Sequence, residues 1–280
     1  MAVLFALTLV HIKASTFSSA SLVPANVILV GGSSGMGKAA ALEVLKHGGK
    51  CLLVSRSLQK LERAQAELQA KVPDAPAVEI KALDVSNEQE VELFSKSLPE
   101  GVYDGLVVSA AGKAPHGLIT SLLTEDTRDM IETKVFTAYL CAKHFGPRLR
   151  SGAGIVFVAG ILNRRPGMRC APLAMANGAL EGLTKSLALD FGPDLRVNCL
   201  SPGFCDTERF DHMDPQRKQQ MMDNTAASLP LRKVGQPQDM GQAIYYLLTA
   251  PFCTGVILDV DGGHGIRQYA NAGSDPMRRT

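Results

Sequence analysis

A short run of glycine and serine has the composition and the position of a phosphate-binding loop. The segment Gly31-Gly32-Ser33-Ser34-Gly35-Met36-Gly37 lies between an apolar run and a stretch with helical spacing. Gly31 permits a tight turn, Gly35 lets backbone amides approach a pyrophosphate, and Gly37 allows the helix to pack closely. The helix that follows directs its N-terminus at the phosphates. The predicted cofactor contacts in this loop are Gly31, Ser33, Ser34, Gly35, Met36 and Gly37.

Polar side chains after the next two apolar runs indicate which dinucleotide would bind. Ser55 and Arg56 follow the second run. A guanidinium holds a 2′-phosphate through paired donors, whereas an acid at this place would repel it. Asp84 and Val85 follow the third run, where a carboxylate can accept from the adenine amino group. These residues favour NADP(H) over NAD(H). The alternative is that Arg56 and Asp84 are solvated loop residues.

The elements that must position these residues alternate regularly along the chain. Short apolar runs occur at Val27–Val30, Cys51–Val54, Val78–Leu83, Gly105–Val108, Gly154–Val158, Val197–Leu200 and Val256–Val260. Helical patterns occur at Lys38–His47, Leu58–Lys71, Glu88–Ser97, Glu125–His144, Ala174–Leu189 and Gln238–Leu248. Continuous apolar runs between amphipathic helices are typical of a parallel sheet that is covered on both faces. We therefore predict an α/β fold: a single-domain, Rossmann-type, doubly wound parallel sheet of about seven strands with helices on both faces.

Composition bounds the class of protein. The 280 residues are 46% apolar and 20% charged, with a net charge of +2 and no tryptophan. This balance gives no footprint for a nucleic acid, and no apolar run reaches the roughly 18–20 residues of a membrane span. We expect an N-terminal extension at 1–25, the Rossmann-type domain at 26–268 and a C-terminal tail at 269–280.

The first residues and the cysteines bear on the compartment. No acidic residue precedes Glu43, and Ala2–Val10 is apolar, so residues 1–25 are either an organelle-targeting segment or an ordinary extension. We expect the second, with a cytoplasmic protein. The six cysteines include no C-x-x-C pair, which favours buried reduced thiols and no metal site. Cys170 and Cys205 fall in loops that we expect near the active site.

From residue 26 to about 266 the chain resembles the short-chain dehydrogenase/reductase family. The matching motifs are Gly31-x-x-x-Gly35-x-Gly37, Asp84, the last two places of Ser109-Ala110-Ala111-Gly112, Ser201-Pro202-Gly203 with Thr207, and Thr254-Gly255 with Asp261-Gly262-Gly263. The resemblance implies further cofactor contacts at Ala110, Ala111, Gly112, Pro202, Gly203 and Thr207. It also implies a homodimer or homotetramer built on the long helix and the helix after the fifth strand. The apolar residues available for that contact are Phe136, Tyr139, Leu140, Leu180, Leu183 and Leu187.

The catalytic side chains of that family have no match here. The family uses an Asn-Ser-Tyr-Lys tetrad, and the segment Ala179–Lys185 fixes the alignment. The residues that occupy the four places, in that order, are Lys134, Gly160, Leu173 and Asn177. No tyrosine occurs between Tyr139 and Tyr245. The chain is therefore similar to an atypical member that lacks the tetrad.

Other residues could replace the missing acid. Lys134 is the candidate catalytic residue, because a partly buried lysine has a lowered pKa and can donate a proton; a surface lysine is the alternative. Asn177 can hydrogen-bond the nicotinamide ribose. Arg164, Arg165 and Arg169 could bind an anion, or be solvated, or form a subunit contact. His116 could act as an acid, although a lone loop histidine is more often inert.

Three functions remain open at this point. The first is an NADP(H)-binding oxidoreductase with non-standard proton delivery, acting on a small apolar or pre-activated carbonyl or imine. The second is a catalytically inactive cofactor-binding scaffold or sensor. The third is a non-redox cyclase or isomerase that uses the same pocket. The polar segment Asp206–Ala227 would cover the substrate, and its phenylalanine and methionines suggest an apolar ligand.

Overall fold

One parallel sheet organises the chain. The computed structural model describes residues 26–266, so the predicted extension at 1–25 and tail at 269–280 lie outside the described residues. The sheet has seven strands in the order β3-β2-β1-β4-β5-β6-β7, and every neighbouring pair is parallel. The strands are β1 (Asn26–Val30), β2 (Lys50–Ser55), β3 (Glu79–Ala82), β4 (Tyr103–Val108), β5 (Leu149–Val158), β6 (Arg196–Pro202) and β7 (Ile257–Val260). This confirms the predicted doubly wound α/β fold.

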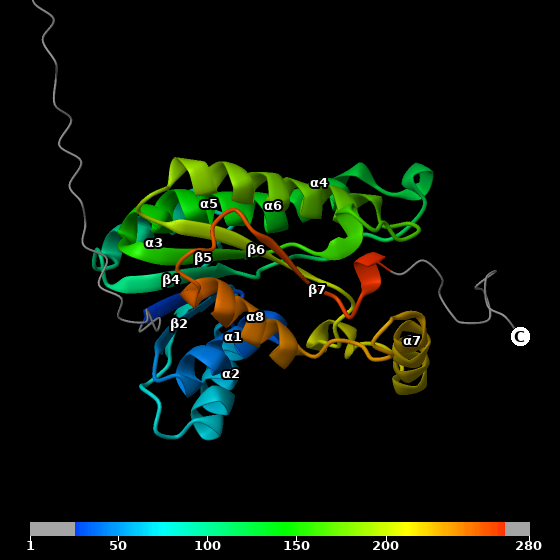
Figure 1. The fold of residues 1–280 in the computed structure, drawn as a ribbon, viewed down its shortest axis with the longest axis horizontal. Coiled ribbons are helices and arrows are strands. Elements are labelled where there is room, and N and C mark those ends of the chain that lie inside the picture. The colour runs from blue at the N-terminus through cyan, green and yellow to red at the C-terminus, as the bar shows by residue number, and fades with distance from the viewer. Residues whose placement is uncertain (1–25, 267–280) are drawn as a thin grey trace, which may run out of the picture.

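Helices cover both faces of the sheet (Figure 1). One face carries α3 (Glu88–Ser97), α4 (Thr124–Ile131), α5 (Thr137–Phe145) and α6 (Ala171–Asp190). The other face carries α1 (Gly35–Lys46), α2 (Leu58–Lys71) and α8 (Pro237–Thr249). Within residues 26–266, no helix combines the length and the apolar character that crossing a bilayer requires.

The core has two halves because strand side chains alternate between faces. In β1, Ile28 and Val30 pack with residues of α5 and α6, including Phe145. Val27 and Leu29 of the same strand pack with residues of α1, α2 and α8. These four side chains of β1 are fully buried, which is why the strand has a continuous apolar sequence.

Several bounds differ by a few residues, as in β5, which begins at Leu149 and not at the predicted Gly154, and two segments differ in kind from the predicted elements. The single helix predicted at Glu125–His144 is interrupted by a π-helical turn at Glu132–Phe136. The polar segment Asp206–Ala227 contains a short 3₁₀ turn at Glu208–Phe210 and the helix α7 (Pro215–Ser228). The sequence marks the start of α7, because Asp214 caps it by accepting from the Arg217 N–H at 3.0 Å and proline stands in its first turn.

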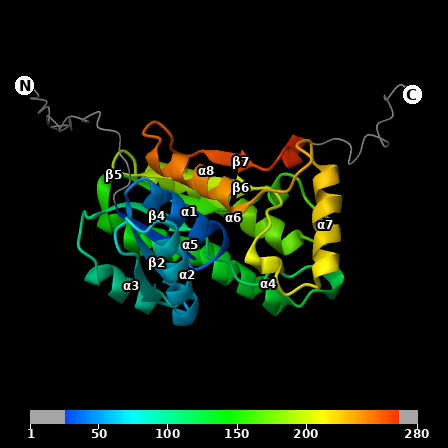
Figure 2. The same cartoon turned by 90° about the horizontal axis from the view of Figure 1, so that it is seen from below.

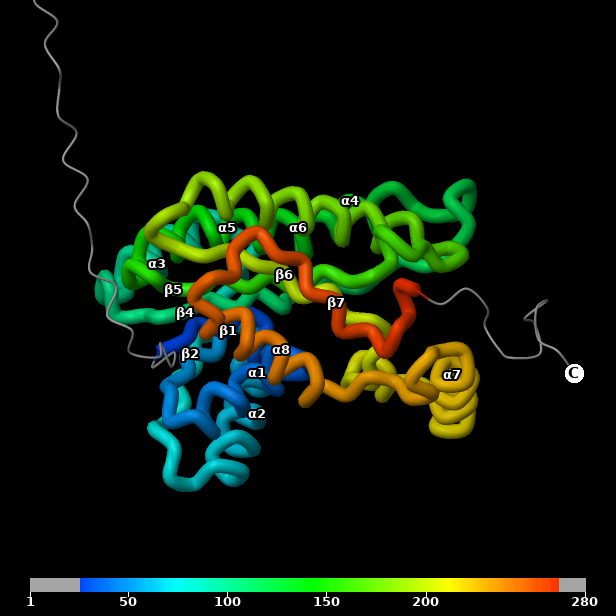
Figure 3. The backbone as a smooth tube through the Cα atoms, viewed as in Figure 1, coloured from blue at the N-terminus to red at the C-terminus, as the bar shows by residue number. Residues whose placement is uncertain are grey.

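The loops that carry the predicted site meet at one end of the molecule. All strands are parallel, so the segments after them leave from the same edge of the sheet, as the tube in Figure 3 shows. Helix α7 lies beyond that edge, at the same end as the start of α4 (Figure 2). The strand order reverses between β1 and β4, where folds of this kind bind their ligands.

Candidate active site

The glycine loop after β1 is built by close backbone packing. Gly31 has φ +83°, and a Cβ there would lie 2.6 Å from the Ala110 backbone nitrogen. Gly37 permits the first turn of α1 to contact the Gly31 carbonyl, with which a side chain would collide. Gly35 has φ +51°, a conformation that favours glycine. The structure therefore brings the loop after β1 against the loop after β4, as the motif requires.

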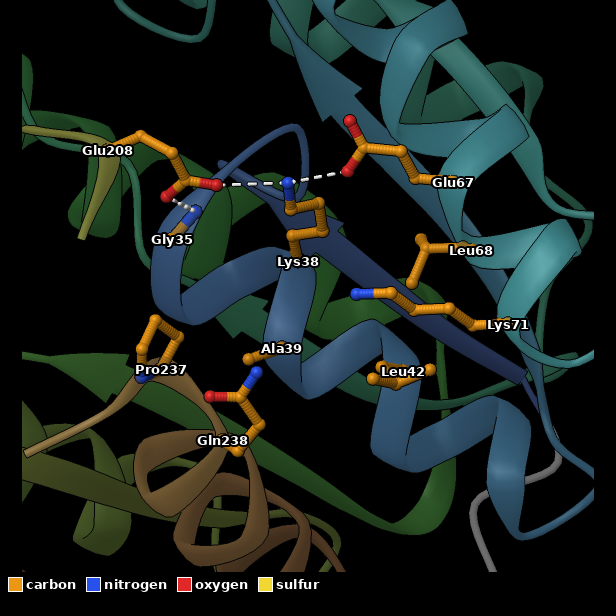
Figure 4. A pocket seen from close by; sticks show the side chains of 10 residues that line it. All are labelled: Gly35, Lys38, Ala39, Leu42, Glu67, Leu68, Lys71, Glu208, Pro237 and Gln238. Carbon is orange, nitrogen blue, oxygen red and sulfur yellow. Dashed lines mark hydrogen bonds and ion pairs between the residues drawn. The ribbon is translucent and has the colours of Figure 1, made fainter. Parts of the chain in front are cut away.

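The N-terminus of α1 already binds an anionic group. The Gly35 N–H donates to Glu208 Oε2 at 2.8 Å, and Lys38 Nζ lies 2.9 Å from Glu208 Oε1 (Figure 4). The sequence analysis missed both Glu208 and Lys38. Their only sequence signal is adjacency, since Glu208 follows Thr207 and Lys38 follows Gly37. The Gly35–Glu208 bond shows that the geometry of this loop suits an anion.

The residues predicted to contact the adenosine lie on neighbouring strands. Ser33 Oγ and Ser55 Oγ are 3.2 Å apart, and Arg56 is exposed next to Ser55. Asp84 Oδ1 accepts from the Ser86 hydroxyl at 2.7 Å and from the Ser86 N–H at 3.1 Å. The Ser86 hydroxyl bond, aided by the charge of Arg56, lowers the pKa of Asp84 despite its partial burial. Arg56 and Asp84 therefore lie close enough to interact electrostatically.

The remaining predicted cofactor positions lie around the same edge. Met36, in the first turn of α1, packs against the core, and Val85 is buried. Ala110, Ala111 and Gly112 follow β4, and a Cβ at Gly112 would collide with the side chain of Thr133. Pro202 is buried at the end of β6, while the Gly203 N–H donates to Val260 O at 3.0 Å. The Thr207 methyl would lie 3.7 Å from a Cβ at Gly35.

A buried lysine joins the π-helical turn to α6. Lys134 Nζ donates to Asn177 Oδ1 at 2.8 Å and to Ala159 O at 3.0 Å. Lys134 is 6% exposed and Asn177 is 1% exposed. Gly160 completes the group, since a Cβ there would lie 2.9 Å from Asn177 Nδ2. Burial lowers the pKa of Lys134 to about 8. Of the alternatives for Lys134, the structure selects the buried one.

The fourth position of this group and the neighbouring loop lie at the start of α6. Leu173 is half-buried one turn before Asn177. Cys170 immediately precedes α6, and its Sγ lies 3.4 Å from His116 Nδ1 in the loop after β4. Partial burial raises the pKa of Cys170. The structure therefore pairs two residues that sequence reasoning treated separately.

Arg164 does not line the site as a free cation. Its guanidinium binds both carboxylate oxygens of Asp259, lies 3.1 Å from Glu181 Oε1, and donates to Ser201 Oγ at 2.8 Å. These groups tie the loop after β5 to β6, β7 and α6. The hypothesis that Arg164 binds a substrate anion is therefore wrong, because two carboxylates already neutralise it. Arg169 has φ 62° and is exposed.

The fold and this edge define a class: α/β proteins that hold a dinucleotide at the switch point of a Rossmann-type sheet. Among residues 26–266, no three histidine, cysteine or acidic side chains group as metal ligands would. Residues 30–265 match the family described as enoyl-(acyl carrier protein) reductase. The chain belongs to the short-chain dehydrogenase/reductase family and is an oxidoreductase of that type.

Individual relatives span most of the chain. The short-chain dehydrogenase/reductase ATR9 of Stachybotrys chlorohalonatus is 31% identical over 250 residues, which cover 85% of this chain and 96% of that protein. A small-chain dehydrogenase solved in complex with NADPH shares 27% identity and a TM-score of 0.71, covering 86% and 99% of the two chains. An NADPH-bound short-chain oxidoreductase of Pseudomonas aeruginosa, described as containing an atypical catalytic centre, shares 25% identity and a TM-score of 0.77, covering 85% and 96%.

Proposed function

We propose that this chain is an NADPH-dependent reductase in which Lys134 delivers the proton that a tyrosine gives in typical family members. Its substrate is a small apolar or pre-activated carbonyl or imine. The observation that carries the proposal is the buried Lys134–Asn177 hydrogen bond, because both residues occupy tetrad positions in the predicted family alignment.

The cofactor site supports this function. Gly31 and Gly37 have no room for side chains, and Gly35 has a positive φ that favours glycine. The Gly35 N–H already donates to a carboxylate, which is an anionic partner. Arg56 stands beyond β2, where a 2′-phosphate would meet its guanidinium. The solved neighbours that hold NADPH favour the same cofactor. When bound, NADPH supplies a hydride to the substrate carbon.

The rest of the chemistry falls to Lys134. An ammonium has three N–H donors, and within the described residues Asn177 and Ala159 accept from two of them. We assign the third to the substrate oxygen or nitrogen, to which it transfers its proton as the C–H bond forms. Lys134 then becomes a neutral amine, a form that burial favours, and it regains a proton from water. Asn177 orients the ammonium from its buried position on α6.

The neighbouring side chains suit a small apolar substrate. Leu173 contributes an apolar wall in the place of a phenol, and Gly160 contributes no side chain that competes for a substrate oxygen. Phe210, in the segment after β6, stacks on Phe204 with ring centroids 5.3 Å apart. A pre-activated iminium already carries positive charge and needs no proton donor.

Steady-state NADPH oxidation with two substrates tests the proposal. One substrate is an unactivated ketone and the other a cyclic iminium. A positioned acid contributes about 10²–10⁴ in rate, so Lys134→Met should lower kcat for the ketone by that factor and leave the iminium rate nearly unchanged. Lys143→Met on α5 is the matched control, because that lysine is exposed and binds Glu88.

Other outcomes would contradict the proposal. An equal loss on both substrates would show that Lys134 is structural. NADPH binding with no oxidation of any carbonyl or imine would favour a cofactor-binding scaffold or sensor. Product formed without a change in NADPH would favour a cyclase or isomerase. Asn177→Ala should lower the reaction rate less than loss of the catalytic lysine does in a typical family reductase. The reason is that Asn177 does not lower the pKa of a catalytic tyrosine.

A further inference from the structure

The carboxylate of Glu208 occupies the N-terminus of α1. Its Oε2 accepts the Gly35 N–H at 2.8 Å, and its Oε1 lies 2.9 Å from Lys38 Nζ (Figure 4). Ser34, the residue that precedes α1, makes no capping bond with its side chain. The first turn of α1 is therefore capped by a residue 173 positions away, from the segment after β6.

This contact uses the donor that the proposed function assigns to the cofactor. The first N–H groups of a helix have no partner within the helix, and they attract anions. The Gly35 N–H lies in the glycine motif that is expected to approach the pyrophosphate. A carboxylate and a pyrophosphate would compete for this N–H, and two anions in contact repel each other. Only one of the two groups can hold this position.

Ion pairs hold the carboxylate in place. Lys38 lies between Glu208 and Glu67, whose Oε2 is 2.8 Å from the same ammonium. Burial acts to raise the pKa of Glu208, but its hydrogen bonds to Lys38 and to backbone amides outweigh burial and keep the pKa below its usual value. Glu208 is therefore ionised at neutral pH. Its neighbour Thr207 lies over Gly35, so the whole turn closes on the loop after β1.

We propose that Glu208 is a built-in competitor of the cofactor, which holds the segment after β6 closed on α1 until a dinucleotide displaces it. The inference rests on the proposed function, because that function places the pyrophosphate at α1. Displacement of Glu208 moves the same segment that contributes Phe210 and leads into α7. Cofactor binding therefore reorganises the cover of the substrate region.

Titration of the full chain with NADPH, followed by the fluorescence of the nucleotide, tests the competition. Glu208→Gln keeps the shape of the side chain and removes its charge. A charge-assisted hydrogen bond of this kind should lower the affinity of the parent protein for NADPH by about 10- to 100-fold. The variant should therefore bind NADPH that much more tightly. Asp211→Asn removes one negative charge from the same segment but pairs with Lys218, so its Kd should stay within about twofold of the parent value.

A second measurement reports on the contact without the cofactor. Arg209 is exposed next to Glu208, so limited trypsin cleavage after Arg209 reads how firmly the turn is held. Glu208→Gln should be cut several-fold faster than the cofactor-free parent. Glu67→Gln should be cut at the parent rate, because Lys38 keeps Glu208 as its partner.

The outcomes separate the two proposals. Unchanged or weaker NADPH binding by Glu208→Gln would overturn the competition, and so would equal tightening in Asp211→Asn, which would reveal a general charge effect. Cleavage at equal rates in parent and Glu208→Gln would overturn the contact itself. Faster cleavage of the variant, with no NADPH binding by either protein, would instead contradict the proposed cofactor and with it the competitive role.

Discussion

At the level of single residues, the candidate site is built from hydrogen bonds and ion pairs between side chains that lie far apart in the sequence. Sequence analysis placed Lys134 and Asn177 at two positions of one catalytic group but did not predict the hydrogen bond between them, because they are 43 residues apart and Lys134 lies in a π-helical turn. It also left three roles open for Arg164, because its partners Glu181 and Asp259 lie far away in the sequence, in α6 and β7. Pairs of polar groups that lie far apart in the sequence give no local sequence pattern, whereas the glycine motif after β1 does.

Reduction of an unactivated ketone should depend on pH through Lys134. Burial lowers the pKa of Lys134 to about 8, so the ammonium that donates the proton is present below that pH and lost above it. We expect kcat/KM of the parent to fall about tenfold for each pH unit above about 8. The rate of an iminium substrate should show no such fall. A ketone profile that stays flat to pH 10 would contradict the assignment.

Arg56 should determine the choice between the two nicotinamide cofactors. Its guanidinium stands at the end of β2, where it would pair with a 2′-phosphate. NADPH should therefore bind more tightly than NADH, and Arg56→Asp should weaken or reverse that preference by repelling the phosphate. Calorimetric titration with both nucleotides measures this. Equal affinities in the parent protein would contradict it, and Arg63→Asp on α2 provides a variant of equal charge change.

At the level of secondary structure, the local sequence pattern was sufficient to predict the bounds of a helix that is amphipathic and capped. The bounds predicted for α2 and α3 match the structure, and both helices start with a side-chain cap, from Ser57 and Asn87. The π-helical turn was missed because it keeps an apparently continuous helical period. Helix α7 was missed because it is mostly polar and buries only Met222, so hydrophobic periodicity gives it no signal.

The contact between α1 and α8 should be sensitive to one methyl group. A Cβ at Gly241 would lie 2.7 Å from the backbone carbonyl of Ala39, so the two helices touch through their main chains. Gly241→Ala should lower the free energy of unfolding by about 1–3 kcal/mol, because neither backbone can move aside. Urea denaturation measures the change. Gly182→Ala on α6 is the control; its methyl meets nothing within 4 Å and should stabilise the helix by about 0.5–1 kcal/mol.

At the scale of the whole molecule, the surface bears on assembly. Leu140 and Leu180, which sequence analysis offered to a second subunit, are buried in the core of the chain itself. Phe136 and Tyr139 are 47% and 45% exposed, and their rings pack edge to face with centroids 6.4 Å apart. Together they form an apolar area near the junction of the π-helical turn and α5. The homodimer or homotetramer remains a prediction that rests on the family resemblance, with this exposed pair among the residues available for the contact.

Light scattering at micromolar concentration should give the mass of a dimer or tetramer. Tyr139→Glu should shift the protein toward the monomer, because it places a charge in the apolar area. Leu58→Glu, at a half-exposed position on the opposite face of the sheet, should leave the mass unchanged. A monomeric parent protein would contradict the prediction. A variant that remains oligomeric would place the interface elsewhere.

The close approach of Gly160 to Asn177 limits the substitutions that this group of buried residues can accept. A side chain at position 160 would meet the Asn177 amide, which Lys134 holds in place. Gly160 also has φ +152°, which L side chains rarely adopt, so Gly160→Ser is strained even without Asn177 and is further hindered while that side chain is present. Loss of Asn177 in turn leaves the Lys134 cation with one fewer buried acceptor. The effects of substitutions at positions 134, 160 and 177 should therefore not add, and position 160 can accept a side chain only if its own backbone also changes.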